Sequence, residues 1–133
     1  MQMVRLAIEG NEKFKASDFE FTLPRPSYTI NTLSALEKAF PDREFVLLIG
    51  ADNWKKFDRW YRHEEILARY EIIVYPRDNS LKPELPAGVT WLSAKLHDVS
   101  STQIRELVAN GCSISGLVVP AVQVFIDKNN LYR

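Results

Sequence analysis

The sequence predicts an α/β protein built on a doubly wound parallel sheet, because strand and helix signals alternate along the chain. Three short apolar runs carry the strand prediction, at residues 44–49, 71–75 and 89–92. Other stretches, such as residues 28–40 and 63–70, repeat their apolar residues at helical spacing. Since no repeat, low-complexity tract or linker interrupts the pattern, we expect a single domain over residues 1–133.

Two elements are predicted before the first of these strands. Residues 3–8 have the apolar spacing of the second half of an amphipathic helix. Residues 15–23 predict a strand, because Phe19 and Phe21 alternate with charged and polar neighbours. Pro24 ends this strand, since proline cannot continue a hydrogen-bonded ladder.

The middle of the chain alternates helix and strand. Residues 28–40 predict a helix with an apolar face made of Ile30, Leu33, Leu36 and Phe40. Residues 44–49 form a near-continuous apolar run, which is typical of a strand covered on both faces. A short helix is expected to begin within residues 50–53, and residues 63–70 predict another helix that buries Ile66 and Leu67.

The second half of the chain contains two further predicted strands and two predicted helices. The strands at 71–75 and 89–92 flank a stretch rich in turn formers, residues 78–88, which predicts a surface loop. A helix follows the hydroxyls of residues 100–102, and Gly111 is its stop signal. The final helix begins at Pro120, a residue suited to the first helical position, and is expected to bury Val122, Phe125 and Ile126.

Composition excludes several classes of protein. Hydrophobic residues make up 46% of the chain, and 17 basic residues balance 17 acidic ones. No field of one sign exists to attract nucleic acid, so anion binding must be local. The single Cys112 excludes an intrachain disulfide, and with two histidines it argues against a Cys/His zinc site. No apolar run approaches a membrane span and residues 1–8 are too polar for a secretory signal, so we expect a cytoplasmic protein.

Polar residues follow three of the predicted strands. Gly50-Ala51-Asp52 follows the first apolar run, Pro76-Arg77 the second, and the segment Ser100-Ser101-Thr102 comes after the third. Ligands of open parallel sheets bind at the carboxyl ends of the strands. The sequence therefore predicts that these clusters share one rim of the sheet.

The hydroxyl cluster has the features of an anion site. Ser100 or Ser101 is a good N-cap for the helix that follows, because its oxygen can accept a hydrogen bond from a first-turn N–H. The remaining first-turn N–H groups and the helix dipole favour an anion, and Arg105 adds a planar fork suited to phosphate. An ordinary helix cap beside a surface arginine is the alternative.

Five motifs occur in the order found in bacterial nicotinate-nucleotide adenylyltransferases, and the chain resembles that family over nearly its whole length. The motifs are Arg25-Pro26-Ser27-Tyr28-Thr29, Gly50-Ala51-Asp52-Asn53, Trp60-Tyr61, Tyr75-Pro76-Arg77 and Val99-Ser100-Ser101-Thr102 with Ile104-Arg105. The last of them marks the wider nucleotidyltransferase superfamily. The segments around Thr29 and Trp60 narrow the resemblance to the nicotinate enzyme.

The resemblance implies a Rossmann-like fold and adenylyl transfer from ATP, with Mg2+, to nicotinate mononucleotide, giving deamido-NAD and pyrophosphate. It implies that the ATP site uses Gly50, Asp52, Ser100, Ser101, Thr102 and Arg105. It implies that the mononucleotide site uses Ser27, Tyr28, Thr29, Trp60, Tyr61 and Arg77, the last toward the phosphate. ATP and the mononucleotide are the expected partners, and neither nucleic acid nor a membrane is expected.

The sequence departs from the family in one respect. The family opens with a strand, a glycine-rich turn and a His-x-Gly-His motif, and none of these occurs here, so no catalytic residue is identified. His63 and His97 lack the neighbours of that motif. We expect His63 to be a solvent-facing helix residue and His97 to be a loop residue. The resemblance thus predicts a truncated, inactive enzyme whose sheet lacks a strand at its N-terminal side. Such a sheet has an open pairing edge through which homo-oligomers can form.

Two alternatives remain open at the level of sequence. A non-catalytic nucleotide-binding remnant would also lack the His-x-Gly-His motif. An adenylyltransferase for another substrate, such as phosphopantetheine, would share the Ser-Ser-Thr segment but would not be expected to keep Ser27-Tyr28-Thr29 together with Trp60-Tyr61.

Overall fold

The computed structural model describes residues 1–76, 82–93 and 99–133. The chain divides into two compact units. The sheet unit spans Glu20–Asp98, and the helical unit combines Met1–Phe19 with Val99–Arg133. The expectation of a single domain over residues 1–133 stays a prediction.

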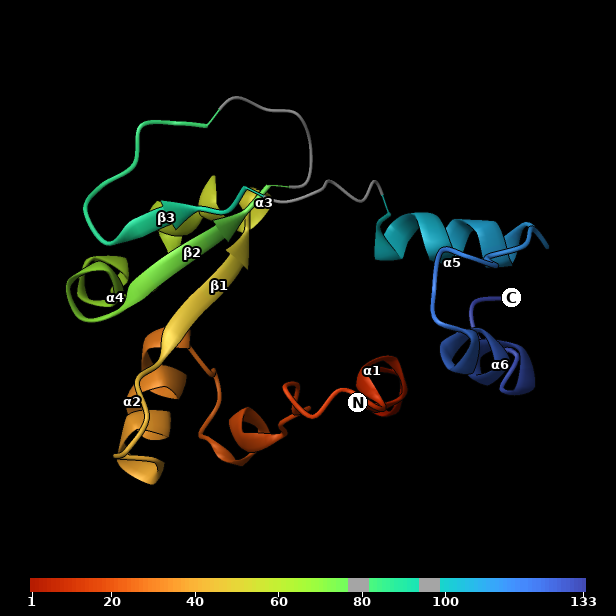
Figure 1. The fold of residues 1–133 in the computed structure, drawn as a ribbon, viewed down its shortest axis with the longest axis horizontal. Coiled ribbons are helices and arrows are strands. Elements are labelled where there is room, and N and C mark those ends of the chain that lie inside the picture. Colours follow the sequence, from red (N-terminus) through yellow and green to blue (C-terminus); the bar gives the residue numbers. More distant parts are fainter. Residues whose placement is uncertain (77–81, 94–98) are drawn as a thin grey trace. The chain divides into compact units, whose positions relative to one another are not determined.

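The sheet unit contains the three predicted apolar strands. They are β1 (Val46–Gly50), β2 (Glu71–Tyr75) and β3 (Val89–Trp91), which pair in parallel in the order β1-β2-β3 (Figure 1). Leu47 lies opposite Ile72, Ile49 opposite Val74, and the strand ends Gly50 and Tyr75 are partners. The predicted parallel α/β architecture is confirmed.

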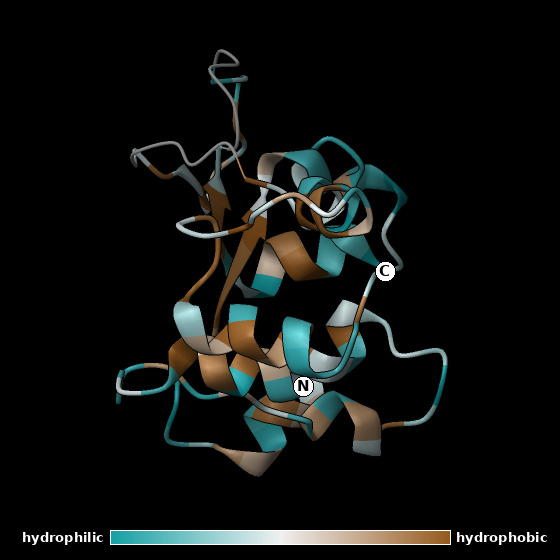
Figure 2. Cartoon of the chain, turned by 90° about the vertical axis from the view of Figure 1, so that its right-hand side faces the viewer, coloured by the Kyte–Doolittle hydropathy of each residue, from teal (hydrophilic) through white to brown (hydrophobic). Residues whose placement is uncertain are grey.

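Helices cover one face of this sheet. They are α2 (Thr29–Ala39), α3 (Ala51–Trp54), the 3-10 helix η2 (Phe57–Arg59) and α4 (His63–Arg69), as the sequence predicted for α2, α3 and α4. The core of the unit is formed by Ile30, Leu33, Ile49, Ala51, Phe57, Ile66, Tyr70, Ile72 and Val74. Figure 2 shows the hydrophobic colour running along the strands of this unit. The alternation of buried residues in β2 places Ile72 and Val74 on the helix-covered face.

The prediction that the first strand is covered on both faces is wrong for two of its residues. Val46 is 43% exposed and Leu48 is 62% exposed, whereas Ile49 is buried. β1 is an edge strand of the described sheet, and the helices of its own unit pack on the face that carries Ile49. An apolar run therefore does not by itself distinguish a strand buried on both faces from one buried on a single face.

The prediction of a strand at residues 15–23 is also wrong. Phe19–Thr22 forms a short 3-10 helix, η1, and Phe21 is 65% exposed. Within the described residues, this segment pairs with none of β1, β2 and β3, although β1 is an edge strand. Alternation of aromatic and polar residues is therefore not enough to predict a strand, because strand preference depends on packing against neighbouring strands.

A polar clasp joins α2 and α4 on the outside of the sheet unit. The guanidinium of Arg69 donates to Glu37 at 2.6 Å, to Glu65 at 2.8 Å and to Ser34 at 3.2 Å. The hydroxyl of Tyr70 donates to the same Glu37 carboxylate at 2.8 Å. Burial and this hydrogen bond raise the pKa of Tyr70. These hydrogen bonds hold the end of α4 against α2.

The helical unit contains α1 (Gln2–Ile8), α5 (Ser101–Ala109) and α6 (Pro120–Lys128), all three predicted from the sequence. Its core consists of Ile104, Val108, Ile114, Val122 and Ile126, with Met3 and Leu6 of α1 packed against it. α5 ends as predicted at Gly111 (φ 68°), where the N–H groups of Gly111 and Cys112 donate to Val108 and Leu107. No helix among the described residues is long and apolar enough to cross a membrane.

Candidate functional site

An aromatic cavity of about 230 Å³ lies in the sheet unit, between the start of α2 and the segment joining η2 to α4. Its lining residues are Ser27, Tyr28, Thr29, Arg59, Trp60 and Tyr61. Five of these six residues are the mononucleotide-site residues that the sequence resemblance implied. The structure thus brings together two motifs that are well separated in the sequence.

The walls of the aromatic cavity are held by ring contacts. The rings of Tyr28 and Tyr61 lie 4.5 Å apart between centroids at an interplanar angle of 33°. Trp60 packs against the buried Phe57 with centroids 5.3 Å apart, so it is anchored to the core from one side. Tyr28 and Tyr61 are 40% and 50% exposed, so the rings still present surface to a ligand.

Local backbone conformation presents both motifs to the cavity. Tyr28 is extended and precedes the first turn of α2, which has no acidic residue and no side-chain cap. The N–H groups of Asn31 and Thr32 donate to the Tyr28 carbonyl at 2.9 and 3.1 Å. The two earlier N–H groups of the first turn, those of Thr29 and Ile30, have no acceptor within the helix. On the other side, η2 ends at Arg59, Trp60 is extended, and Arg62 adopts a left-handed conformation before α4 begins. This sharp turn places Trp60 and Tyr61 outside both helices.

Gly50 and Asp52 lie where the sequence predicted, at the carboxyl end of a strand. Gly50 is the last residue of β1, pairs with Tyr75 at the end of β2, and is the N-cap of α3. Asp52 is exposed in the first turn of α3. A carboxylate at that position lies next to the first-turn N–H groups of the helix.

The hydroxyl cluster lies at the start of α5 in the helical unit. Ser100 is the N-cap, and its Oγ accepts a hydrogen bond from the N–H of Gln103 at 3.1 Å. Arg105 donates to the hydroxyl of Thr102 at 3.3 Å, so these two side chains lie on one face of the helix. The first turn contains no acidic residue. The predicted cap and the grouping of polar side chains at the helix start are confirmed.

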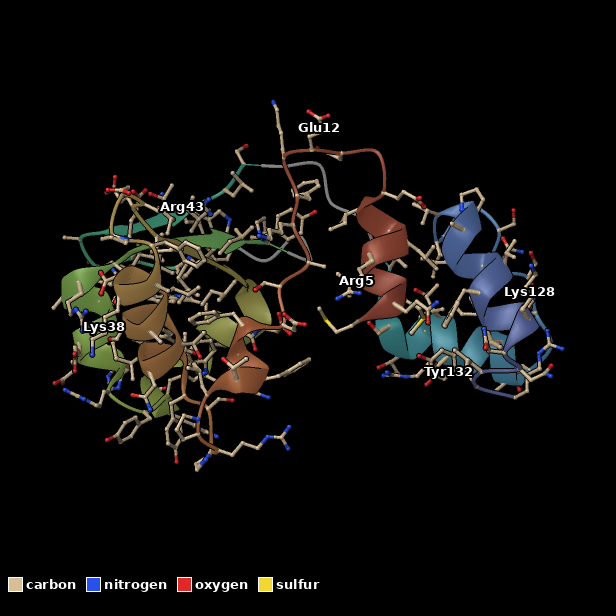
Figure 3. All side chains as sticks on the ribbon, turned by 90° about the horizontal axis from the view of Figure 1, so that it is seen from below. Arg5, Glu12, Lys38, Arg43, Lys128 and Tyr132 are labelled. Carbon is tan, nitrogen blue, oxygen red and sulfur yellow. The ribbon has the colours of Figure 1, made fainter. Side chains whose placement is uncertain are left out.

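A second, smaller cavity of about 170 Å³ adjoins this helix start. Ser101, Arg105 and Tyr132 line it together with Met3, Ile104, Val118, Val122 and Ile126. Figure 3 shows Tyr132 beside α5, although it lies near the end of the chain. The hydroxyl and guanidinium groups thus border an apolar floor. Because Gly50 and Asp52 belong to the sheet unit, the shared rim stays a prediction.

Arg77 and His97, both considered in the sequence analysis, lie outside the described residues. His63 is the first residue of α4, and it is half-buried with its ring edge-on to Phe57 at 6.0 Å rather than fully solvent-facing. Among the residues that the structure describes, no three or more His, Cys, Asp or Glu side chains gather to hold a metal ion.

Comparison with known proteins decides the family. The family model described as "Cytidylyltransferase-like" matches residues 1–107. A protein of Cytophaga hutchinsonii named as a nicotinate-nucleotide adenylyltransferase is 43% identical over 132 residues, covering 98% of this chain and 69% of its own length. The chain belongs to the nicotinate-nucleotide adenylyltransferase family. The Bacteroides fragilis member is 49% identical over 124 residues, and the alignment covers 92% of this chain but only 62% of that relative.

Solved structures agree on the fold. A nicotinate-nucleotide adenylyltransferase structure from Vibrio parahaemolyticus matches with a TM-score of 0.77 at 25% identity, over 99% of this chain and 68% of the other. The Plasmodium falciparum nicotinic acid mononucleotide adenylyltransferase complexed with NaAD has a TM-score of 0.77 at 19% identity, over 98% and 71% of the two chains. The second likeness concerns the fold alone. Both place the chain within the architecture that the nicotinate-nucleotide adenylyltransferase family uses.

Arg59 is the lining residue that the sequence resemblance did not single out. It directly precedes the Trp60-Tyr61 motif, but an arginine in a polar segment also fits a solvated surface. Its adjacency to two aromatic residues was the signal available. Only the fold of η2 around Phe57 puts it on the wall of the aromatic cavity.

Proposed function

We propose that the chain forms the mononucleotide site and part of the ATP site of an enzyme that transfers the adenylyl group of ATP to nicotinate mononucleotide. The observation that carries this proposal is the aromatic cavity, where Ser27-Tyr28-Thr29 meets Trp60-Tyr61 in a member of the family. The products would be deamido-NAD and pyrophosphate.

The aromatic cavity suits a pyridine carboxylate. A pyridine ring is flat and apolar on its faces, and stacking on Trp60 contributes about 0.5–1.5 kcal/mol beyond area burial. The carboxylate would accept hydrogen bonds from the Thr29 hydroxyl and from first-turn N–H groups of α2. An amide in the same place would face donors with its own N–H groups, which leaves polar groups unpaired and costs affinity.

The ATP phosphates are assigned to the start of α5. The proposed contacts are Ser100, Ser101, Thr102 and Arg105, with Gly50 and Asp52 approaching the nucleotides from the end of β1 and Arg77 reaching the mononucleotide phosphate. An arginine fork and unpaired helix N–H groups both favour phosphate oxygens. Mg2+ would enter bound to ATP, since this ion usually keeps several waters and takes one or two carboxylates along with substrate phosphates.

Adenylyl transfer requires positioning and charge stabilisation more than a protein nucleophile. A phosphate oxygen of the mononucleotide forms a bond to the α-phosphorus of ATP, and the bond to the pyrophosphate leaving group breaks. The sequence contains no His-x-Gly-His motif to hold the reacting phosphates. We therefore propose that residues 1–133 alone bind substrate without turnover, an arrangement shared with a non-catalytic nucleotide-binding protein.

Pyrophosphate release tests the assignment of activity. The 133-residue chain, with ATP, Mg2+ and nicotinate mononucleotide, should release none, and the same chain joined to an upstream segment carrying the His-x-Gly-His motif should release it. In the joined protein, Arg105→Ala should weaken the use of ATP far more than it lowers the melting temperature, because an exposed arginine contributes little to stability. Turnover by the 133 residues alone would overturn the proposal of an inactive chain.

Substitutions in the aromatic cavity test the assignment of the substrate. In the joined protein, nicotinate mononucleotide should be preferred over nicotinamide mononucleotide by kcat/KM. Trp60→Ala should reduce use of the mononucleotide by about tenfold for each 1.4 kcal/mol of stacking lost, with the dependence on ATP unchanged. Thr29→Val should reduce the preference itself. A wild-type ratio near unity, or unchanged kinetics in both variants, would place the pyridine site elsewhere.

A further inference from the structure

We propose that Arg59 is a specificity-determining residue of the aromatic cavity, where its guanidinium pairs with the carboxylate of the nicotinate ring. The inference rests on the proposed function and assigns a residue that the family motifs do not include. Arg59 is the last residue of η2 and lines the same cavity as Trp60, Tyr61 and Thr29.

The charge of the aromatic cavity favours an anion. Arg59 is the charged member of its lining set, the other five side chains being hydroxyl-bearing or aromatic. Within the described part of the chain, the Arg59 guanidinium forms none of the ion pairs, which join Arg5, Arg62, Arg69 and Arg133 to their carboxylates. The first turn of α2 adds the positive end of a helix without an acidic residue to offset it. A cationic residue and the start of a helix therefore border one small space that has no Asp or Glu among its lining residues.

The size of the cavity decides which anion of the mononucleotide enters it. A volume of about 230 Å³ is below the roughly 300–1,000 Å³ of a complete small-molecule site. The cavity can hold the pyridine ring and the group bonded directly to it, while the ribose phosphate extends beyond. The carboxylate is therefore the anion brought next to Arg59 when the ring stacks on Trp60.

The guanidinium group of arginine binds a nicotinate carboxylate better than a nicotinamide amide. The planar fork of arginine matches the two oxygens of a carboxylate, and charge-assisted hydrogen bonds of this kind are about twice as strong as neutral ones. A nicotinamide ring offers one carbonyl oxygen and an NH2 group, and the NH2 group would face further donors. Arg59 therefore contributes more to binding the acid than to binding the amide.

Calorimetric titration of the 133-residue chain tests this role with nicotinate mononucleotide and nicotinamide mononucleotide as probes. Arg59→Gln should weaken binding of the acid by about tenfold or more and binding of the amide by less than about twofold. Arg59→Lys keeps the charge without the fork and should give an intermediate loss. Lys56→Gln is the matched control, because Lys56 is exposed, carries the same charge and does not line the cavity. It should leave the preference unchanged.

The outcomes separate this inference from the proposed function. Equal losses for both mononucleotides in Arg59→Gln would assign the residue to the phosphate and overturn the inference. No loss of affinity for either mononucleotide in Arg59→Gln would overturn it while leaving the proposed function in place. Failure of the wild-type chain to bind either mononucleotide would overturn both. Circular dichroism melting checks folding, and if Arg59→Gln is unfolded, the loss of preference in Arg59→Lys decides.

Discussion

Arg62 shows how one residue's backbone can shape the site. Its φ of 54° and ψ of 40° lie in the left-handed region, immediately after Tyr61 of the aromatic cavity. A side chain in this conformation costs about 1–2 kcal/mol, a cost that glycine does not bear. The chain thus holds a strained residue at the point where Trp60 and Tyr61 must leave the path of η2 before α4 begins.

Paired substitutions at Arg62 measure that strain. Both Arg62→Ala and Arg62→Gly lose the exposed ion pair with Glu65, which contributes about 0–1 kcal/mol. We expect the glycine variant to be more stable than the alanine variant by about 1 kcal/mol, because only alanine keeps a Cβ in the left-handed region. Urea denaturation gives the difference. Equal stability of the two variants would show that the turn does not strain a side chain.

At the residue scale, the sequence predicted the aromatic walls of the cavity and missed its cation. Ser27, Tyr28, Thr29, Trp60 and Tyr61 were predictable because they occur as ordered motifs. Arg59 was not, since a charged residue in a short polar segment looks the same whether it faces bulk water or a cavity. What decides its environment is the 3-10 turn set by the burial of Phe57, which no local pattern encodes.

At the element scale, α5 was predicted together with its cap. Ser100→Ala should destabilise the chain by about 1 kcal/mol, because it removes the acceptor of the Gln103 N–H. Ser101→Ala is the matched control, since Ser101 is exposed at the first helical position and does not cap the helix. Its effect on the free energy of unfolding should be within about 0.5 kcal/mol. Equal effects of the two substitutions in chemical denaturation would contradict the assignment of the cap.

The clasp between α2 and α4 predicts a loss of stability in alkali. The pKa of Tyr70 is raised in the folded chain, chiefly by burial and then by its hydrogen bond to Glu37. Between its ordinary pKa of about 10 and the raised value, the unfolded chain releases a proton that the folded chain keeps. The contribution is therefore fully present below about pH 10 and is lost as the pH rises through the folded pKa.

Tyr70→Phe isolates this contribution. The variant should be less stable near neutral pH, because Glu37 loses a donor, and its melting temperature should fall less steeply above about pH 10 than that of the wild type. Subtracting the two profiles removes the titration of the other tyrosines and lysines. Parallel profiles would show that Tyr70 ionises equally in both states.

The prediction of an element was wrong where its tertiary surroundings, and not its local sequence pattern, determine the structure. The segment at residues 15–23 alternates like a strand, yet Phe19–Thr22 is a 3-10 helix and pairs with none of the described strands. Conversely, the apolar run of β1 indicated burial on both faces although Leu48 is exposed. Helices with apolar residues at helical spacing and strands with continuous apolar runs were predicted correctly, whereas burial and pairing depend on the neighbouring elements.

At the scale of the whole molecule, we expect one domain, although the described residues form two hydrophobic cores. One core packs α2, α4 and the sheet, and the other packs α5, α6 and α1. Each unit is held by its own apolar contacts, and the helical unit draws on both ends of the chain. A single domain thus requires that neither core persists when the other unfolds.

The positions of the tryptophans make this testable. All three, Trp54, Trp60 and Trp91, lie in the sheet unit, so their fluorescence reports on that unit, whereas far-ultraviolet circular dichroism also reports on α1, α5 and α6. If residues 1–133 are one cooperative domain, the two signals should change together during urea denaturation, with equal midpoints and slopes. Val122→Ala creates a cavity in the core of the helical unit alone. In a single cooperative domain it should also lower the urea midpoint of the tryptophan signal. A tryptophan transition unaffected by Val122→Ala, with a shifted dichroism transition, would show two independently folding units.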